Sequence, residues 1–271
     1  MNSRIPIEIQ PLISDFSRLL RSKLPNAAIG LYLQGSVVLQ GFNKDKSDID
    51  FVVVFNHECT EDELLIIQAI HEELKGNHRS YMVAEGQYTT LAHLNKTIHA
   101  ANDRYPKFYY GQYEGLRNGW LDPTALWIVK YEGIAVFGPE VNELDIVVDW
   151  NDLLYAMKYN LHHYWTNKAQ NVEIFMHDDW IDFTVLTLGR IMFTLQNKSI
   201  ITKEQGGYYL LKELLPQWHP LIHEALQIRK GAAEISHFGS KEERAFETQK
   251  IIHFIINLCN KKYNLLDHTE K

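Results

Sequence analysis

The sequence has little cysteine, no long apolar run and no excess of basic residues. Its two cysteines, Cys59 and Cys259, lie far apart and within apolar or helical patterns, so we expect reduced thiols and a cytoplasmic protein. The N-terminus carries Pro6 and Glu8 where a signal peptide needs an unbroken apolar run, and no segment is long and apolar enough to span a bilayer. Neither export nor a membrane partner is expected.

The charge balance argues against nucleic acid as a partner. Lys plus Arg is 27 and Asp plus Glu is 34, a net charge of −7, so the average field repels polyanions and mildly attracts small cations. Two histidine pairs have spacings that suggest a metal, His162–His163 and His219 with His223. Adjacent residues of a helix face different ways and Pro220 places His219 at a helix start, so we expect neither pair to bind a metal.

The first part of the chain mixes helices and strands. An apolar helical period over residues 8–24 is followed by two short apolar runs, 28–35 and 49–55, which read as neighbouring strands. Thr60 and Glu63 form a T-x-x-E capping box at the start of a further helix, which Gly76 ends. A third strand is expected within residues 79–94.

The character changes near residue 150, after which the pattern is mostly helical. A very apolar helix is expected over residues 183–195, and a last one over 241–263 with Ser240 and Glu243 as its capping box. We predict an α/β N-terminal domain with a short mixed β-sheet over residues 1–149, and an all-α helical bundle over residues 150–271.

Two aspartates at the start of the second strand are the first candidate site. Asp48 and Asp50 are two residues apart, so their side chains point to the same face of the strand. Like charges held this close are stabilised by a cation, and hard ions such as Mg²⁺ prefer carboxylate oxygens. The alternative is that both residues merely cap the polar loop before the strand.

Gly35, Ser36 and Ser47 make the cation site more specific. Gly35 and Ser36 follow the preceding strand and offer close backbone approach, amide donors and a hydroxyl to a metal-bound triphosphate, and Ser47 offers a second hydroxyl. This order of strand, Gly-Ser, polar loop, Ser-Asp-x-Asp and apolar strand resembles the nucleotidyltransferase superfamily that includes DNA polymerase beta. The resemblance implies a nucleotidyltransferase fold for the N-terminal domain and a bound nucleotide.

The same resemblance implies a third acidic residue on the neighbouring strand, and Glu85 is available there. In the family this residue completes the metal site or serves as the general base. Asp48, Asp50 and Glu85 would then hold two Mg²⁺ ions and support in-line attack of an acceptor hydroxyl on the α-phosphorus, with pyrophosphate leaving. Glu85 could equally be a surface residue at a bend before Gly86.

The C-terminal half narrows the resemblance. The segment "DDWIDFTVLTLGRIMFTLQNKSIITKEQ" is similar to a helix and turn of the adenylyltransferases that modify streptomycin and spectinomycin. By those motifs Arg190 and Lys203 would bind the triphosphate of ATP. An internal salt bridge of Arg190 is the alternative, and Lys203 also fits an ordinary helix start that Thr202 caps.

The residues that would bind the acceptor are indicated by weaker sequence signals. The resemblance places an aromatic residue against the aminoglycoside, here Tyr113 of "YYGQY", and acids at the start of the arginine-bearing helix, here Asp178, Asp179 and Asp182. Acids at a helix N-terminus are also expected for capping alone. The family has Trp where this chain has Tyr113, and its third strand differs from "EGQYTTLAHL", so adenylyl transfer is the firmer implication and the aminoglycoside the weaker.

The function that these signals predict is Mg²⁺-dependent transfer of AMP from ATP to a hydroxyl of a small, cationic acceptor, as in antibiotic resistance. Two alternatives stay open. One is an adenylyltransferase that acts on a protein partner, and the other is a catalytically inactive nucleotide-binding regulatory module.

Overall fold

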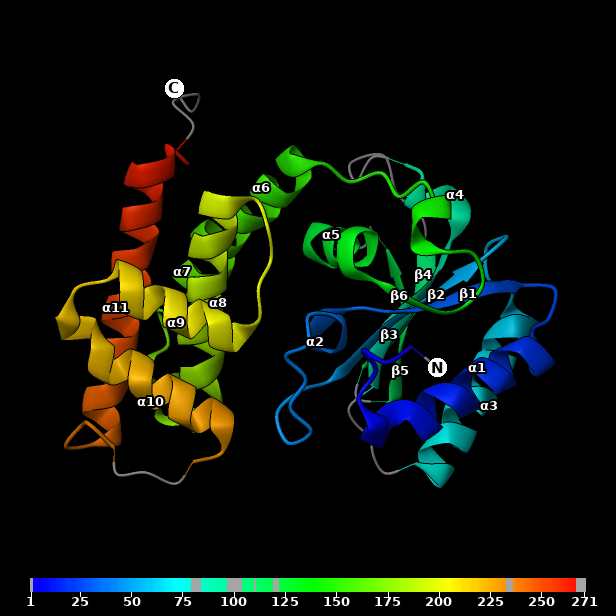
Figure 1. Cartoon of the computed structure of the whole chain (residues 1–271), viewed down its shortest axis with the longest axis horizontal. Helices are drawn as coiled ribbons and strands as arrows, with labels where there is room; N and C mark the ends of the chain where they lie inside the picture. The colour runs from blue at the N-terminus through cyan, green and yellow to red at the C-terminus, as the bar shows by residue number, and fades with distance from the viewer. Residues whose placement is uncertain are drawn as a thin grey trace. The chain divides into compact units, whose positions relative to one another are not determined.

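The computed structural model describes residues 2–78, 84–96, 104–109, 111–118, 122–232 and 236–266. The chain divides into two compact units, Met1–Leu153 and Leu154–Lys271 (Figure 1). We describe each unit by itself. Among the described helices, none combines the length and apolar character needed to cross a membrane.

The first unit is built on a mixed sheet with the strand order β5-β4-β3-β2-β1-β6. β2 is parallel to β3, and the other neighbouring strands pair antiparallel. Its elements in chain order are η1 (Ile7–Ile9), α1 (Gln10–Lys23), β1 (Ala28–Leu33), α2 (Gly35–Val38), β2 (Ile49–Phe55), α3 (Glu61–Asn77), β3 (Ala84–Thr90), α4 (Leu91–Leu94), β4 (Arg104–Tyr109), β5 (Gln112–Asn118), α5 (Pro123–Glu132), β6 (Ile134–Phe137) and η4 (Val141–Glu143).

The two faces of this sheet are covered by different helices, and this separation decides where each site residue points. Phe51 of β2 packs edge-on against Phe16 of α1 with ring centroids 5.1 Å apart, so α1 and α3 cover one face (Figure 1). The other face carries Val52 and Val54, which belong to one apolar cluster with Leu126 of α5. Because side chains alternate along a strand, Asp50 lies on the α5 face together with Val52.

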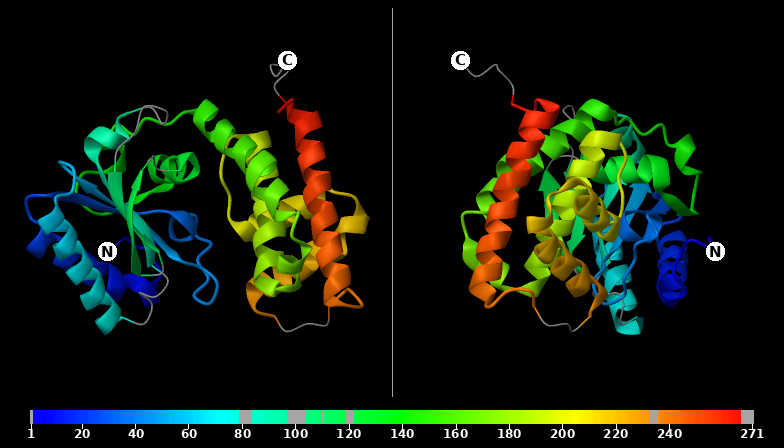
Figure 2. Two further views of the ribbon diagram at one scale, coloured as in Figure 1. Left: turned by 180° about the vertical axis from the view of Figure 1, so that it is seen from behind. Right: turned by 60° about the vertical axis from the view of Figure 1, so that its left-hand side comes forward.

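The second unit is helical. Its elements are α6 (Trp150–Tyr159, which begins in the first unit), the π-helical turn η5 (Asn160–Trp165), α7 (Thr166–Lys168), η6 (Val172–Met176), α8 (Asp178–Asn197), α9 (Lys203–Glu213), η7 (Pro216–Trp218), α10 (His219–Lys230) and α11 (Lys241–Tyr263). α8 packs on α9, α10 and α11 (Figure 2). Eleven of its residues are buried, which confirms the central apolar helix expected from the sequence.

Capping motifs in the sequence predicted the starts of helices in both units. Thr60 and Glu63 form the expected capping box, and so do Thr202 and Gln205. The predicted third strand is shorter than expected: β3 ends at Thr90, whose side chain caps α4, and residues 79–83 lie outside the described part of the chain. Ser240 caps α11, but the Glu243 carboxylate accepts a hydrogen bond from the Gly239 amide instead of completing the box.

His71 of α3 is buried under the sheet and makes folding sensitive to pH. Its Nε2 lies 2.8 Å from the Tyr88 hydroxyl and its ring stacks on Phe108 at 3.6 Å. Burial holds the pKa of His71 well below its usual value, so the folded protein keeps the imidazole neutral where the unfolded chain takes up a proton. Its contribution to stability is therefore present above about pH 6.5 and lost below it, by at most about 1.4 kcal/mol per pH unit.

We therefore expect the unfolding midpoint in urea to fall between pH 7 and pH 5, partly because of His71. The double variant His71→Phe/Tyr88→Phe removes the imidazole together with its hydrogen-bond partner and should show a shallower fall. An equal fall in both proteins would show that His71 does not control the acid sensitivity.

Candidate active site

The candidate site begins where Asp50 meets Gly35. Gly35 has φ +63°, a left-handed conformation that favours glycine, and a Cβ at this position would lie 2.8 Å from Cγ of Asp50. The backbone amide of Gln34 also donates to the Asp50 carbonyl oxygen at 3.1 Å. The turn after β1 and the start of β2 therefore form one surface, with the Asp50 carboxylate seated directly against the glycine.

The side chains of Asp48 and Asp50 lie on the same side of the chain, as the sequence predicted. Both side chains are half-buried, whereas Ile49 between them is buried, so the two aspartates share a side of the chain. In the described residues, Asp48 makes no hydrogen bond or ion pair of its own. The pair is thus a local concentration of negative charge.

Ser36 and Ser47 differ in what their hydroxyls do. Ser36 Oγ is buried and, within the described part of the chain, has no hydrogen-bond partner, which fits a group whose partner is a ligand. Ser47 is buried too, but its Oγ accepts the backbone amide of Asn43 at 3.0 Å and its own amide donates to the Asn43 carbonyl at 2.7 Å. Ser47 thereby fixes the loop that leads into Asp48.

Glu85 is next to Asp50 but is held differently. The two residues are partners in the parallel register of β2 and β3. The Glu85 carboxylate lies 3.4 Å from Nζ of Lys107 on β4, a pair whose side chains are 25% and 33% exposed. Burial raises the pKa of the Glu85 carboxyl, the nearby charges of Asp48 and Glu114 act in the same direction, and Lys107 opposes them.

The predicted three-carboxylate metal site is not assembled. No group of three or more His, Cys, Asp and Glu side chains in the described residues could hold a metal ion. Glu85 lies against Lys107, whereas Asp48 and Asp50 share one side of the chain before and at the start of β2.

Tyr113 requires a correction, because it lies on the other face of the sheet. It is the cross-strand partner of Phe108, with ring centroids 5.5 Å apart, and Phe108 stacks on His71 of α3. Tyr109 alternates to the α5 face with Lys107, which lies over its ring at 5.7 Å. Tyr109 is 42% exposed and lies on the face that carries Glu85.

The basic residues predicted for the nucleotide lie on adjacent helices of the second unit. Gly189 of α8 and Gly206 of α9 let these helices approach closely, since a Cβ at Gly189 would lie 2.6 Å from the Gly206 carbonyl carbon. Arg190 is half-buried at this contact. Lys203 begins α9, and its Nζ lies 4.7 Å from the centre of the Phe183 ring.

Two of the three acids at the start of α8 are held by arginines. Asp178 pairs with Arg244 of α11 at 2.6 Å. Asp182, also predicted for the acceptor, is buried and faces Arg229 of α10 at 3.8 Å. Asp179 is exposed.

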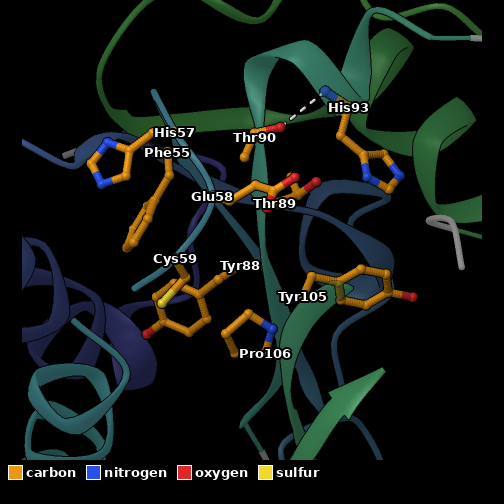
Figure 3. Close-up of a pocket in the computed structure, with 10 residues that line it drawn as sticks. All are labelled: Phe55, His57, Glu58, Cys59, Tyr88, Thr89, Thr90, His93, Tyr105 and Pro106. Carbon is orange, nitrogen blue, oxygen red and sulfur yellow. Dashed lines mark hydrogen bonds between the residues drawn. The ribbon is translucent and has the colours of Figure 1, made fainter. Parts of the chain in front are cut away.

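A small cavity lies at the opposite end of the same strands (Figure 3). It has a volume of about 10 Å³, room for one water molecule, and is lined by Phe55, His57, Glu58, Cys59, Tyr88, Thr89, Thr90, His93, Tyr105 and Pro106. From Glu85 to Thr89 the strand advances about 13 Å, so the cavity is separate from the carboxylates. Burial, together with the nearby Glu63 charge, raises the pKa of the Cys59 thiol to about 12, which disfavours the thiolate.

Comparison with known proteins agrees with this geometry. Residues 13–97 match the family model described as a nucleotidyltransferase domain, and residues 146–253 match the one described as the C-terminal domain of aminoglycoside adenylyltransferase. The chain therefore carries a nucleotidyltransferase domain and is an enzyme of that class. Its second matched segment is similar to the C-terminal domain of the aminoglycoside adenylyltransferases.

Individual relatives are distant in sequence but similar along most of the chain. The spectinomycin 9-adenylyltransferase of Campylobacter jejuni is 23% identical over 84% of this chain and 87% of its own length. The aminoglycoside (3'') (9) adenylyltransferase of Escherichia coli is also 23% identical, over 94% and 96%. A crystal structure of an Enterococcus spectinomycin adenyltransferase with ATP and spectinomycin has a TM-score of 0.69 at 20% identity, over 91% of this chain and 98% of that one. The likeness to this structure shows a shared fold.

Proposed function

We propose that this enzyme transfers AMP from ATP to a hydroxyl of a small, cationic acceptor such as an aminoglycoside or spectinomycin, with release of pyrophosphate. The observation that carries the proposal is the Asp50 carboxylate seated against Gly35, beside Glu85, in a nucleotidyltransferase domain. The names of the relatives support the acceptor class, and the net charge of −7 suits a cationic compound.

The residues that we propose for the nucleotide are those that the sequence predicted. Gly35 allows close approach of the phosphates, and the buried Ser36 hydroxyl gives them a donor. Ser47 fixes the loop before Asp48, because its hydroxyl oxygen accepts the Asn43 amide. Arg190 and Lys203 would supply positive charge to the triphosphate.

Asp48 and Asp50 fit a magnesium ion, because they are two half-buried carboxylates on one side of the chain. Bound there with the triphosphate, Mg²⁺ would neutralise charge that develops on the phosphate oxygens. The chain's own part is to hold Asp50 in place: the Gln34 amide donates to its backbone carbonyl, and its side chain lies against Gly35.

Glu85 would act as the general base. The acceptor oxygen forms a bond to the α-phosphorus, the bond from that phosphorus to the bridging oxygen of the β-phosphate breaks, and pyrophosphate leaves. The proton of the acceptor hydroxyl passes to the Glu85 carboxylate. On the acceptor side we propose Tyr109, on the Glu85 face, and the exposed Asp179.

The test is pyrophosphate release from Mg²⁺-ATP by purified protein, with a panel of aminoglycosides, spectinomycin and lincosamides. We expect release that depends on one class of acceptor and stops when EDTA removes the metal. Expression in a susceptible bacterium should raise the inhibitory concentration of the same compound. Absence of release with every acceptor, despite Mg²⁺-dependent ATP binding, would overturn the small-molecule acceptor and favour a protein partner.

Asp50→Asn should abolish this activity, because it keeps the shape of the side chain and removes its charge. We expect kcat to fall by at least about 10²- to 10³-fold, as for loss of a preorganised electrostatic group. Asp45→Asn is the matched control, since Asp45 is an exposed acid of the same loop. Equal activity of the two variants would contradict the assignment of the site.

A further inference from the structure

Lys107 of β4 is a charged residue at the site that the sequence motifs did not indicate. Its Cα is paired with that of Gln87 in the antiparallel register of β3 and β4. Glu85 is two residues before Gln87, so Glu85 and Lys107 emerge on the same face of the sheet. Their charged groups are 3.4 Å apart, and both side chains are only partly exposed.

The position of Lys107 is fixed by more than this ion pair. It stands on a strand in the interior of the sheet, between β3 and β5, and its ammonium group also lies over the Tyr109 ring. A lysine anchored in this way has fewer alternative positions than one on a solvent-exposed helix. The ion pair therefore ties the Glu85 carboxylate toward β4, on the side away from β2 and its aspartates.

The charges near Glu85 decide where its carboxylate would move if Lys107 were absent. The carboxylates of Asp48 and Glu114 place negative charge near Glu85 and raise its pKa. The positive charge of Lys107 lowers it. Carboxylates repel one another unless a positive charge lies between them. Without Lys107, the Glu85 carboxylate would therefore have its lowest electrostatic free energy next to a divalent cation bound by Asp48 and Asp50. With Lys107 present, Glu85 has a positive partner of its own.

We propose that Lys107 is a positioning residue, which holds the Glu85 carboxylate on the acceptor side and keeps it from becoming a third metal ligand. This inference rests on the proposed function. It divides the three carboxylates into two that serve the metal, Asp48 and Asp50, and one that serves the acceptor hydroxyl.

The test compares Lys107→Met and Lys107→Arg with the wild-type enzyme. We expect Lys107→Met to lower kcat by about 10- to 100-fold, as for loss of a supporting partner, with the KM for Mg²⁺-ATP nearly unchanged. Lys107→Arg should restore most of the activity because it restores the charge. Lys23→Met is the matched control, since it breaks a Lys–Glu pair of 2.7 Å between α1 and α3, away from the site.

The second readout is binding of Mn²⁺ alone, followed by electron paramagnetic resonance without substrates. Release of Glu85 should make Lys107→Met bind Mn²⁺ about 3- to 10-fold more tightly than the wild type, because a third carboxylate can then approach the ion. The double variant Lys107→Met/Glu85→Gln should lose that gain. A purely structural defect would weaken Mn²⁺ binding instead.

Unchanged kcat in Lys107→Met, or Mn²⁺ binding no tighter than in the wild type, would overturn the inference. Failure of the proposed function is distinguishable, because it would appear as a wild-type enzyme without pyrophosphate release. The Mn²⁺ measurement would then still decide whether Lys107 controls the position of Glu85.

Discussion

Gly35→Ala is expected to inactivate the enzyme while leaving it folded. The new Cβ would lie 2.8 Å from Cγ of Asp50 and would meet the carboxylate itself, so this side chain must move. The left-handed φ of +63° adds about 1–2 kcal/mol of backbone strain for a residue other than glycine. Because displacement of a catalytic group by about 1 Å can cost 10²-fold in rate, we expect at least that loss in kcat. Steady-state pyrophosphate release measures it.

The matched control is Gly76→Ala in α3. A Cβ at Gly76 would meet nothing within 4 Å, and its helical conformation suits alanine. This change should leave activity unaltered and stabilise the protein by up to about 1 kcal/mol. If Gly35→Ala kept nearly full activity, the contact between Asp50 and the glycine turn would have no part in catalysis.

The sequence identified those parts of the site that depend on neighbours in the chain. Alternation along the chain places Asp48 and Asp50 on the same side, and a glycine two residues after the end of β1 allows the tight turn. Capping boxes at Thr60 and Thr202 are also local, because the two members lie three residues apart. Such features could be predicted before any tertiary contact was known.

The parts that were missed depend on register between strands. Gly115 has φ +91° and lies at a bulge in the pairing of β4 with β5, which sets which side chains of β5 face α3. Tyr113 was chosen by motif, and this register turns it away from Glu85. Lys107 was missed for a similar reason, since only the pairing of β3 with β4 brings it to Glu85.

The acids of α8 show the same limit in the helical unit. Asp178 and Asp182 look alike in sequence, as acids near a helix start, and both meet arginines that follow far along the chain. Capping alone does not explain them, because Asp182 is buried. The distinction between an acceptor-binding acid and a structural one therefore depends on α10 and α11.

Arg244→Met is expected to be the most destabilising of these changes. Arg244 of α11 is buried and its guanidinium donates to Glu224 of α10 at 2.7 Å, to Asp178 of α8 at 2.6 Å and to the Met176 carbonyl at 3.3 Å. Methionine fills similar space but leaves the buried Glu224 carboxylate without a countercharge. Removal of one partner of such a pair costs about 3–5 kcal/mol, which urea unfolding of the whole chain would detect.

Asp178→Asn separates the structural role of this triad from the predicted acceptor role of Asp178. The Asp178 side chain is 56% exposed, so loss of its charge should cost no more than about 1 kcal/mol of stability. If Asp178 only anchors α8 to α11, the KM for the acceptor stays unchanged in this variant. A raised acceptor KM at unchanged stability would instead assign Asp178 to the acceptor, and an equal loss of stability in both variants would contradict the buried Glu224 as the source of the Arg244 effect.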